Sequence, residues 1–358
     1  MANTKRMKLG LGLYRHMLDR EHFDFARQCG CTHIVVHLVD YFNKGNQSNK
    51  NNQPIGDDSG WGYAGDPDRL WTVDELLALK KAINEAGLQL EAIENFDPAH
   101  WYDILLDGPQ KEKQMEGLKQ IIRNVGAAGI PVMGYNFSLA GVSSRIVGNF
   151  ARGGASSVGM ETVDERPIPN GMVWNMIYDA HAPSGHLPEI SHAELWARLQ
   201  YFLKELVPVA EEAGVRLAAH PDDPPMPRIR RTPRLVYQPH LYRKLLDLCP
   251  SRSNALEFCL GSIAEMTEGD IYEATRDYAR DIAYVHFRNI KGKVPHYKEV
   301  FVDEGDIDMI KILRILHESG FEGVLIPDHT PRMSCGQPWY AGMAYALGYM
   351  NACLKLLG

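Results

Sequence analysis

The sequence predicts an α/β fold of the (β/α)8 barrel type, in which eight parallel strands alternate with helices around a closed sheet. Three observations support this prediction. Eight short apolar runs have the length of strands, a helix–turn–strand pattern recurs along the chain, and residues of metal-binding types end the last four runs. A chain of 358 residues suits one large barrel or two average domains. The regular recurrence favours a single barrel domain over residues 1–358.

The eight predicted strands are apolar runs of five to eight residues, rich in β-branched side chains. In chain order they are Met7–Tyr14, His33–Leu38, Leu88–Glu94, Ile130–Phe137, Val215–His220, Ala255–Cys259, Ile282–Phe287 and Val324–Asp328. A doubly wound sheet is the alternative, and its dinucleotide-binding form carries a glycine fingerprint after the first strand. Gly10-Leu11-Gly12 lies inside a run and lacks the third glycine, so the barrel is favoured.

Glycines mark the ends of the predicted helices. Gly87, Gly129, Gly214 and Gly320 each stand between an amphipathic stretch and the next apolar run. Glycine is the residue that most often follows the last turn of a helix. Because single strands alternate with these helices, we expect the strands to be parallel.

Two long segments are rich in loop-forming residues. Residues 41–69 follow the second strand and are rich in Asn, Gln, Gly and Asp, while residues 139–187 follow the fourth strand and contain Gly153-Gly154 and several prolines. Both lie on the side of the barrel where the strands end, which is where barrel enzymes have their active sites. We expect these insertions to form lids or walls that set specificity, rather than disordered decoration.

The composition disfavours several kinds of partner. A formal net charge of −7 argues against nucleic acid and anionic membranes as main partners. The sequence has no run of about 18 apolar residues, and its N-terminus lacks the apolar core of a signal peptide. Six cysteines are too few for a disulfide scaffold in a chain of this length. We therefore expect a cytoplasmic homo-oligomer with reduced thiols, whose partner is a small molecule.

The strongest functional signal is a series of four residues of metal-binding types, His220, Cys259, His286 and Asp328. Each closes one of the last four predicted strands, and 39, 27 and 42 residues separate them, about one βα unit each. Side chains at these strand ends converge on one mouth of a barrel. Taken singly, each is more often a satisfied polar group or a small buried residue. Together, imidazole, thiolate and carboxylate are the ligands of a divalent transition metal, so the series predicts a metal site.

Further polar residues flank the predicted metal site. Asp222 follows the first predicted ligand in a proline-rich loop, where it either orients the imidazole, contacts substrate or forms a simple turn. Arg288 faces the same side of its strand as His286, where it either clamps a carboxylate or forms a salt bridge within the barrel. His329 follows the last predicted ligand and is a candidate general acid or base.

Other side chains near the expected mouth are candidates to bind a substrate. Tyr340 lies shortly beyond the last strand and is expected to supply a phenol to the same mouth. The ends of the third and fourth strands offer further hydrogen-bonding side chains: Glu94, Tyr135 and Asn136. A divalent ion beside an arginine and a histidine suits proton abstraction next to a carboxylate, because the metal stabilises the enediolate that forms.

At these residues the chain resembles the mannonate dehydratase family, which belongs to the xylose-isomerase-like group of TIM barrels. The similar passages lie within residues 121–137 and 202–354. The strings that carry the resemblance in the second passage are Ala219–Pro225, Phe258–Ser262, Val285–Asn289, Pro327–His329 and Glu304–Met309. The last of these is similar to a D-G-D-x-D-M element of the family, with Glu304 in place of its first aspartate.

The resemblance implies a Mn²⁺-dependent lyase that removes water from D-mannonate to give 2-keto-3-deoxy-D-gluconate in hexuronate catabolism. It implies metal ligation by the four residues of the series, and catalytic or substrate-binding roles for Arg288 and Tyr340. Because thiolate ligands favour softer ions, Zn²⁺, Co²⁺ and Fe²⁺ are alternatives to Mn²⁺. Two other functions stay open: a sugar isomerase or epimerase on the same scaffold, and a non-catalytic sensor of sugar acids.

The chain departs from the family pattern in its N-terminal third and in two loops. Its first strand reads Gly10–His16 where the family has an Arg-Trp-Tyr-Gly string, and Tyr41–Arg69 replaces a short loop. Ser143-Ser144-Arg145 stands loosely where the family has an Asp-Trp-Thr-Arg-Thr string. All three differences lie where substrate is expected to be held. We therefore expect D-mannonate to be a poorer substrate than a different, larger sugar acid.

Overall fold

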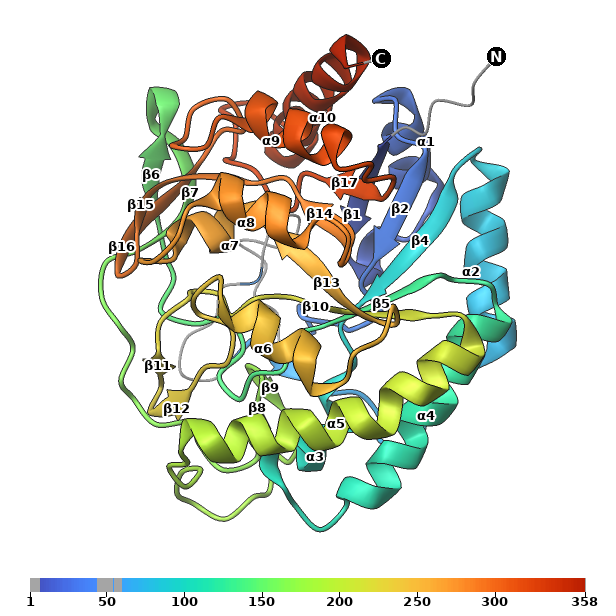
Figure 1. Ribbon diagram of the computed structural model, residues 1–358, viewed down its shortest axis with the longest axis vertical. Coiled ribbons are helices and arrows are strands. Elements are labelled where there is room, and N and C mark those ends of the chain that lie inside the picture. The colour runs from blue at the N-terminus through green and yellow to red at the C-terminus, as the bar shows by residue number, and fades with distance from the viewer. Residues whose placement is uncertain (1–6, 44–53, 55–59, 358) are drawn as a thin grey trace.

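The computed structural model describes residues 7–43, 54 and 60–357, and its centre is a closed barrel of eight parallel strands (Figure 1). Around the barrel the strands follow the order β1, β17, β14, β13, β10, β5, β4 and β2. In chain order their bounds are β1 (Lys8–Leu13), β2 (His33–Val36), β4 (Gln89–Glu94), β5 (Val132–Tyr135), β10 (Arg216–Ala219), β13 (Asn254–Cys259), β14 (Ile282–His286) and β17 (Val324–Ile326). Each falls on one of the eight predicted strands, so the predicted (β/α)8 barrel is confirmed and the doubly wound alternative is excluded.

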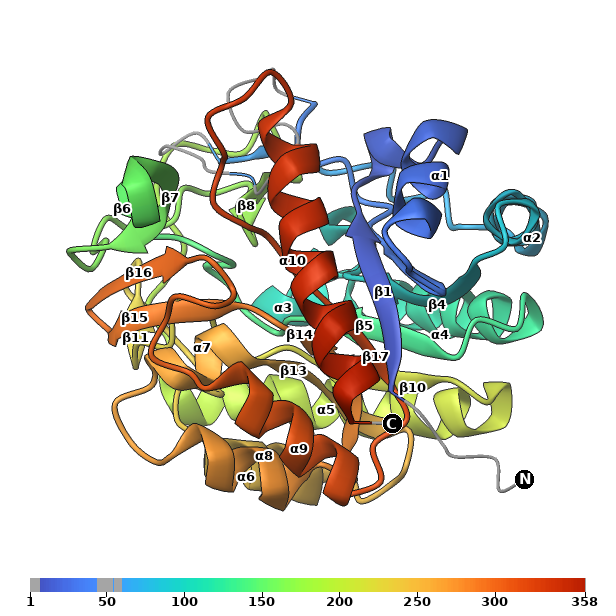
Figure 2. The same cartoon turned by 90° about the horizontal axis from the view of Figure 1, so that it is seen from above.

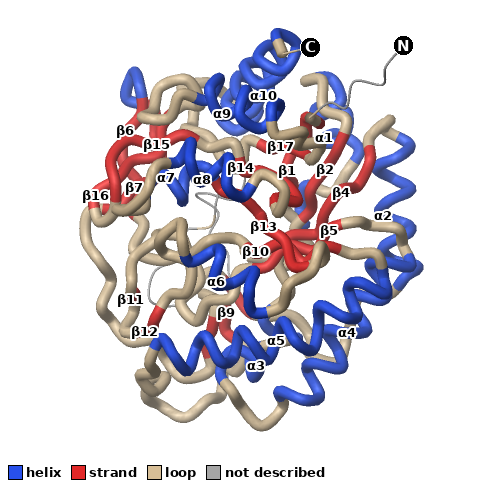
Figure 3. Tube along the Cα trace, viewed as in Figure 1, coloured by secondary structure: helices blue, strands red, loops and turns tan. Residues whose placement is uncertain are grey.

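Helices cover the outside of the barrel (Figure 3). Their bounds are α1 (Arg20–Gln28), α2 (Val73–Glu85), α3 (Tyr102–Leu106), α4 (Lys111–Ala127), α5 (His192–Ala213), α6 (Leu241–Leu248), α7 (Leu260–Glu265), α8 (Ile271–Tyr278), α9 (Met309–Glu318) and α10 (Pro338–Leu356). The glycines predicted to end helices, Gly87, Gly129, Gly214 and Gly320, have φ between 67° and 77°. This left-handed conformation costs glycine least, which explains its place at these turns.

The longest helix shows how local sequence sets an element's limits. Ser191 begins α5 with a capping box, in which its side chain accepts a hydrogen bond from the backbone N–H of Glu194 and the Glu194 carboxylate accepts from the backbone N–H of Ser191. Gly214 ends it. In between, α5 buries an apolar face against the barrel and packs beside α4 (Figure 1). Near the C-terminus, helix α10 lies along strand β1 (Figure 2).

The strand register brings the predicted ligands to neighbouring positions. Cys259, the last residue of β13, lies opposite His286, the last residue of β14. On the far side of β14, His286 lies opposite Ile326 of β17, two residues before Asp328. His220 directly follows β10, which pairs with β13. The four predicted ligands therefore come from four consecutive strands of the closed barrel.

Small sheets are built from the segments that follow the barrel strands. Their strands are β3 (Gly62–Tyr63), β6 (Ile146–Ala151), β7 (Ala155–Met160), β8 (Met172–Val173), β9 (Met176–Ile177), β11 (Arg228–Ile229), β12 (Thr232–Pro233), β15 (Asn289–Lys293) and β16 (His296–Val300). One sheet has the order β15, β16, β7, β6, so the segment after β5 pairs with a hairpin that follows β14 (Figure 1). Residues 44–53 and 55–59 of the predicted insertion at 41–69 lie outside the described residues.

The interior of the barrel changes from apolar to polar toward the mouth. The apolar part is a cluster of mostly small side chains: Val35, Ala92, Val132, Ala218, Ala255, Ala283, Tyr284, Val324 and Ile326. Nearer the mouth, Gly134 leaves room for two polar side chains, because a Cβ there would lie 2.5 Å from the Tyr284 hydroxyl and 2.7 Å from Glu257 Oε2. Within the described residues, no helix is both long and apolar enough to cross a membrane.

Candidate active site

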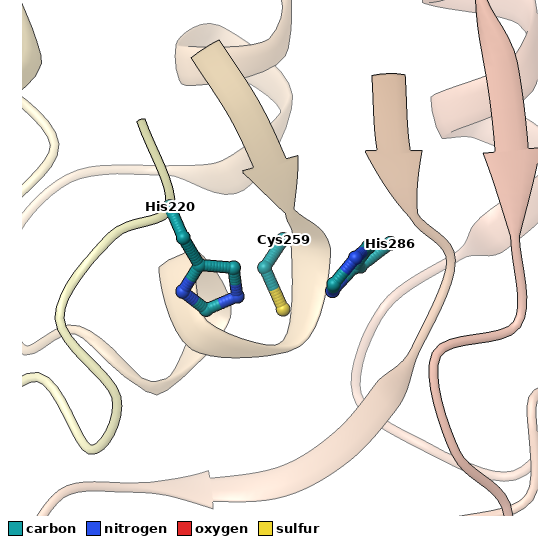
Figure 4. A group of neighbouring side chains, drawn as sticks. All are labelled: His220, Cys259 and His286. Atoms are coloured by element: carbon teal, nitrogen blue, oxygen red, sulfur yellow. The ribbon is translucent and has the colours of Figure 1, made fainter. Parts of the chain in front are cut away.

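Three of the predicted ligands converge at the C-terminal ends of neighbouring strands. One ligand atom from each of His220, Cys259 and His286 lies within 4.8 Å of the other two (Figure 4). The rings of His220 and His286 are 5.4 Å apart, and the Cys259 side chain points between them (Figure 4). Two imidazoles and a thiol at this spacing are a donor set suited to a divalent transition metal.

The electrostatics of Cys259 fit metal binding. Burial alone would raise the pKa of the thiol, but the guanidinium of Arg288 and the two imidazoles hold it well below its usual value. The Ser262 hydroxyl oxygen also lies 3.2 Å from Sγ. These neighbours favour the thiolate, the form in which cysteine ligates metals.

Asp328 lies at the edge of this group. Its Oδ1 is 3.6 Å from Nδ1 of His286, and its Oδ2 is 3.4 Å from Nε of Arg288. Its φ of 35° is unusual for a residue with a side chain. Such strained backbone is concentrated at functional sites, because the surrounding structure must hold it there. The residues present thus fit a metal with His220, Cys259 and His286 as ligands and a carboxylate alongside.

Arg288 lies beneath the mouth as a hub of ion pairs, which we name the Arg288 hub. Four buried or partly buried carboxylates surround its guanidinium: Asp223 at 2.9 Å, Glu265 at 3.4 Å, Asp328 at 3.4 Å, and Glu299 in the shortest contact. Its side chain is 1% exposed, and it does not line the cavity described below. Of the two sequence-based alternatives for Arg288, the structure has the salt bridge within the barrel.

A cavity opens above the three ligands, and its wall has two chemically different sides. On the ligand side the lining residues are charged or ionisable: Arg145, His220, Asp223, His286, Asp328 and His329. On the opposite side most are aromatic or amide-bearing: Tyr14, His37, Tyr41, Trp61, Glu94, Asn95, Asn136 and Trp174. A concave site with convergent polar groups and a metal-binding set is the expected place for substrate.

Two predicted substrate-binding residues line this cavity. Glu94 Oε2 is 3.2 Å from Nε2 of His286, and His37 lies 3.7 Å from the other oxygen. Burial opposes ionisation of Glu94, but these two imidazoles lower its pKa to about 2. Asn136 donates to the carbonyl oxygen of Pro221 at 3.1 Å and accepts from Nε1 of Trp174 at 3.1 Å. Both side chains are held in place by partners on other elements.

Two other predicted substrate-binding residues do not reach the cavity. Tyr135 is fully buried and packs on Phe202 of α5, with ring centroids 5.0 Å apart. It points outward because alternate residues of a strand face opposite sides of the sheet. Asp222 accepts from the backbone N–H groups of Leu235 and Val236 at 2.7 and 2.8 Å, so it ties down its own loop.

The neighbour of Asp222 is the residue that lines the cavity. Oδ2 of Asp223 accepts from Arg145, Ser262 and Arg288, each at 2.9 Å. Burial would raise the pKa of this carboxyl, but the two guanidinium groups hold it far below its usual value. Arg145 itself lines the cavity with a side chain 8% exposed. From the sequence, Arg145 is notable only as part of Ser143-Ser144-Arg145, which loosely takes the place of the family's Asp-Trp-Thr-Arg-Thr string.

His329 and Tyr340 have different surroundings. His329 lines the cavity; its Nδ1 lies 2.7 Å from Oε2 of Glu299, and its Nε2 lies 3.2 Å from Asp328 Oδ2. Tyr340 instead donates its hydroxyl to Glu21 of α1 at 2.8 Å, outside the cavity, while its neighbour Trp339 lines it. The structure therefore brings His329 to the mouth and leaves Tyr340 between α10 and α1.

The sequence prediction missed Glu257. This fully buried carboxylate lies inside β13, and its Oε1 is 3.1 Å from Nε2 of His286. Burial and the nearby Glu94 raise its pKa to about 8. With Glu94 and His286 it forms a second group whose ligand atoms lie within 4.8 Å of one another. Strand alternation could have identified it, because Glu257 stands two residues before Cys259 and faces the same side.

Comparisons with known proteins agree with this geometry. A family model described as D-mannonate dehydratase matches residues 19–147 and 153–355. The mannonate dehydratase of Streptococcus pneumoniae is 34% identical over 307 residues, covering 79% of this chain and 82% of that protein. That of Streptococcus agalactiae is 32% identical over 309 residues, covering 80% and 88%.

Solved structures give the same result. The crystal structure of mannonate dehydratase from Streptococcus suis matches with a TM-score of 0.77 and 27% identity, covering 99% of this chain and 94% of that chain. A D-psicose 3-epimerase from Clostridium cellulolyticum, crystallised with D-tagatose, matches with a TM-score of 0.59 and 12% identity, covering 97% and 99%. At that identity the second likeness concerns the fold alone.

Proposed function

The chain belongs to the D-mannonate dehydratase family, and from this premise we propose that it is a metal-dependent hydro-lyase that converts D-mannonate, or a closely related aldonate, into a 2-keto-3-deoxy acid and water. The observation that carries the proposal is the convergence of His220, Cys259 and His286 on one another, beside a cavity that His220 and His286 line. Beside these three side chains, the carboxylate of Glu299 holds the ring of His329. A histidine oriented in this way can act as the general acid or base in a reaction that moves protons.

The family is metal-dependent, and in this chain His220, Cys259 and His286 would hold the ion, with Asp328 alongside. Manganese is the ion we propose, although the thiolate of Cys259 also suits zinc, cobalt or iron. When bound, the ion supplies Lewis-acid stabilisation of the negative charge that develops next to the substrate carboxylate.

The dehydration itself needs two proton movements. The bond between C2 and its hydrogen breaks, its electrons form a C2–C3 double bond, and the C3 hydroxyl leaves as water after gaining a proton. The resulting enol then becomes the 2-keto acid, so no net proton is gained or lost. We assign one of these transfers to His329, because its ring lines the cavity and Glu299 orients it through Nδ1 at 2.7 Å.

The remaining residues of the cavity bind and orient the substrate in this proposal. Arg145 faces the substrate in place of Arg288, whose guanidinium is fully engaged by carboxylates. Glu94 and Asn136 hydrogen-bond substrate hydroxyls. Tyr340 has no contact with substrate in this scheme, because its hydroxyl is engaged by Glu21.

We also propose a role in hexuronate catabolism, in a homo-oligomer that works in a reducing cytoplasm. The reducing compartment is supported by the cysteines: all six in the sequence are free thiols. This usage is typical of proteins inside cells.

The test is a product assay with a panel of sugars. Purified protein loaded with Mn²⁺ is incubated with D-mannonate, other aldonates and ketoses, and 2-keto-3-deoxy products are measured. We expect product from an aldonate. Interconversion of ketoses without aldonate turnover would instead identify an isomerase or epimerase, and binding of aldonates without turnover would identify a sensor.

A further inference from the structure

A second cavity of about 380 Å³ adjoins the active-site cavity. The two share part of their walls: Pro54, Trp61, Val142 and Arg145 line both. We name the second cavity the side chamber; the residues that line it alone include Ser143, Thr162, Asp164, Arg166, Asn175 and Arg230. Its volume falls in the range of small-molecule sites, roughly 300–1,000 Å³. The side chamber is therefore large enough to hold part of a ligand.

The arginines that line the side chamber are already paired with protein groups. Arg166 holds both oxygens of Asp164 at 2.9 Å. Arg230, with a side chain 4% exposed, donates to the backbone carbonyl oxygens of Arg166 and Pro167 and lies 3.9 Å from Asp164. On the shared wall, Arg145 pairs with Asp223 at 2.9 Å. This pairing argues against a phosphate or a second carboxylate as the natural occupant.

What remains to bind a ligand is neutral and partly aromatic. Ser143 and Thr162 bring hydroxyl groups, Asn175 brings an amide whose nitrogen already donates to the Val142 carbonyl oxygen, and Trp61 brings an indole ring. The Oγ atom of Ser143 is buried and has no hydrogen-bond partner within the described part of the chain. A buried polar atom left without a partner costs about 1–3 kcal/mol, so a ligand hydroxyl that reached this atom would gain a hydrogen bond. Hydroxyl-bonding groups next to an aromatic ring match a sugar ring.

We propose that the side chamber is a subsite for a second sugar ring, so that the protein binds an aldonic acid carrying a glycosyl substituent. The aldonate unit occupies the cavity above His220, Cys259 and His286, and the glycosyl unit passes Arg145 into the side chamber. This inference rests on the proposed function, because it takes that cavity as the place of the aldonate. It names the substrate class as disaccharide acids rather than free hexonates.

Calorimetric titration of the metal-loaded protein tests the proposal. D-Gluconate is compared with four acids that carry a sugar on the same gluconate unit: maltobionate, cellobionate, lactobionate and melibionate. At least one of the four is expected to bind roughly tenfold more tightly than gluconate, because a filled subsite adds hydrogen bonds and apolar contact. Equal or weaker binding of all four would overturn the inference.

Two variants localise the gain in affinity. Ser143→Trp fills the side chamber from a buried wall, and Thr162→Trp fills it from an exposed rim. Both are expected to bring the affinity for the best disaccharide acid down to that for gluconate. Ser184→Trp, at an exposed position in the same segment and outside both cavities, is the matched control and should leave the difference intact.

The outcomes separate this inference from the proposed function. If Ser143→Trp strongly lowers the thermal unfolding temperature, its binding result reflects damage to the fold. The exposed variant Thr162→Trp then provides the test of the side chamber. Variants that weaken gluconate and the disaccharide acid equally contradict the subsite. Turnover of D-mannonate is measured in parallel: turnover without preference for any disaccharide acid refutes only the subsite, whereas tight disaccharide binding without dehydration of any aldonate refutes the proposed function.

Discussion

In both halves of the barrel mouth the ends of the strands carry polar side chains, but the two halves use different residue types. In one half, the ends of β10, β13, β14 and β17 supply His220, Cys259, His286 and Asp328. In the other half, the ends of β1, β2, β4 and β5 supply Tyr14, His37, Glu94 and Asn136. Every strand thus places one polar side chain at the mouth. In the proposed function this difference separates two tasks: the first half would hold the ion, and the second half would hold the organic substrate.

If the first half binds the ion, substitution of one of its ligands should remove the metal. Cys259→Ala removes the thiolate and is expected to lower the metal content to near zero in elemental analysis. Because Lewis-acid stabilisation is worth several kcal/mol, kcat/KM should fall by about 10³ or more. Cys249→Ala, at a cysteine outside the cavity, is the control. Full metal occupancy in Cys259→Ala would show that the first half does not have this task.

Glu299 tests the proton-transfer part of the same half. Glu299→Gln weakens the hold on His329 without touching the three ligands, so kcat is expected to fall roughly 10–100-fold, the usual effect of losing such a partner. Metal content should stay unchanged. Glu318→Gln, at an exposed position on α9, serves as the control. A loss of metal equal to the loss of activity would make Glu299 a support of the ion rather than of His329.

Substitutions in the second half should leave the metal content of the protein unchanged. Asn136→Ala removes a donor to Pro221 and an acceptor for Trp174. In the proposed function it also removes a hydrogen bond to a substrate hydroxyl, and losing about 1–3 kcal/mol of binding corresponds to a rise in KM of roughly 5- to 150-fold. Elemental analysis should find the same metal content as in the unaltered protein. An unchanged KM together with reduced metal would reverse the assignment of the two halves.

The smallest effect is expected far from both halves. Thr72 caps α2, and Thr72→Ala should lower the free energy of unfolding by about 1 kcal/mol while leaving KM and metal content unchanged. Urea denaturation measures the first quantity. A changed KM would mean that α2 communicates with the mouth.

The same cap also has a pH dependence. The backbone N–H of Thr72, together with Arg69 and the Thr72 hydroxyl, lowers the pKa of Glu75 from 4.5 to about 2. A carboxyl with a depressed folded-state pKa stabilises the fold above its unfolded pKa and loses that contribution as pH falls through the folded value. The stability difference between the unaltered protein and Thr72→Ala should therefore shrink between about pH 4.5 and pH 2. A difference that stays constant over this range would argue against the bond to Glu75.

Sequence patterns predicted the barrel and the proximity of His220, Cys259 and His286, because both follow from simple periodicities. Apolar runs reveal strands, and imidazole, thiol and carboxylate groups at their ends are recognisable by chemistry alone. The substrate half was harder to predict. Tyr14 and His37 end the first two strands, but aromatic residues at such positions are usually packing residues, so their type gave no signal.

At two places the residue that lines the cavity is the chain neighbour of the predicted residue. Asp223 rather than Asp222 faces the cavity, and Trp339 rather than Tyr340 does. Alternation fixes the facing of a side chain only while the chain stays in a strand. Beyond the last paired residue the backbone turns, and the facing depends on tertiary contacts that local sequence does not encode. Arg288 has the salt-bridged surroundings that the sequence offered as one of two alternatives, and the sequence could not identify its partner Glu299, which comes from a hairpin without a clear periodicity.

The Arg288 hub has a consequence for how the last strand is held. Its carboxylate partners are spread from Asp223 to Asp328, and they come from four separate segments. Loss of the segment that follows β17 would remove Asp328 and leave the buried guanidinium with three of its four carboxylate partners, and breaking a buried ion pair is costly. A single side chain therefore fastens the last strand of the barrel to three earlier segments of the chain.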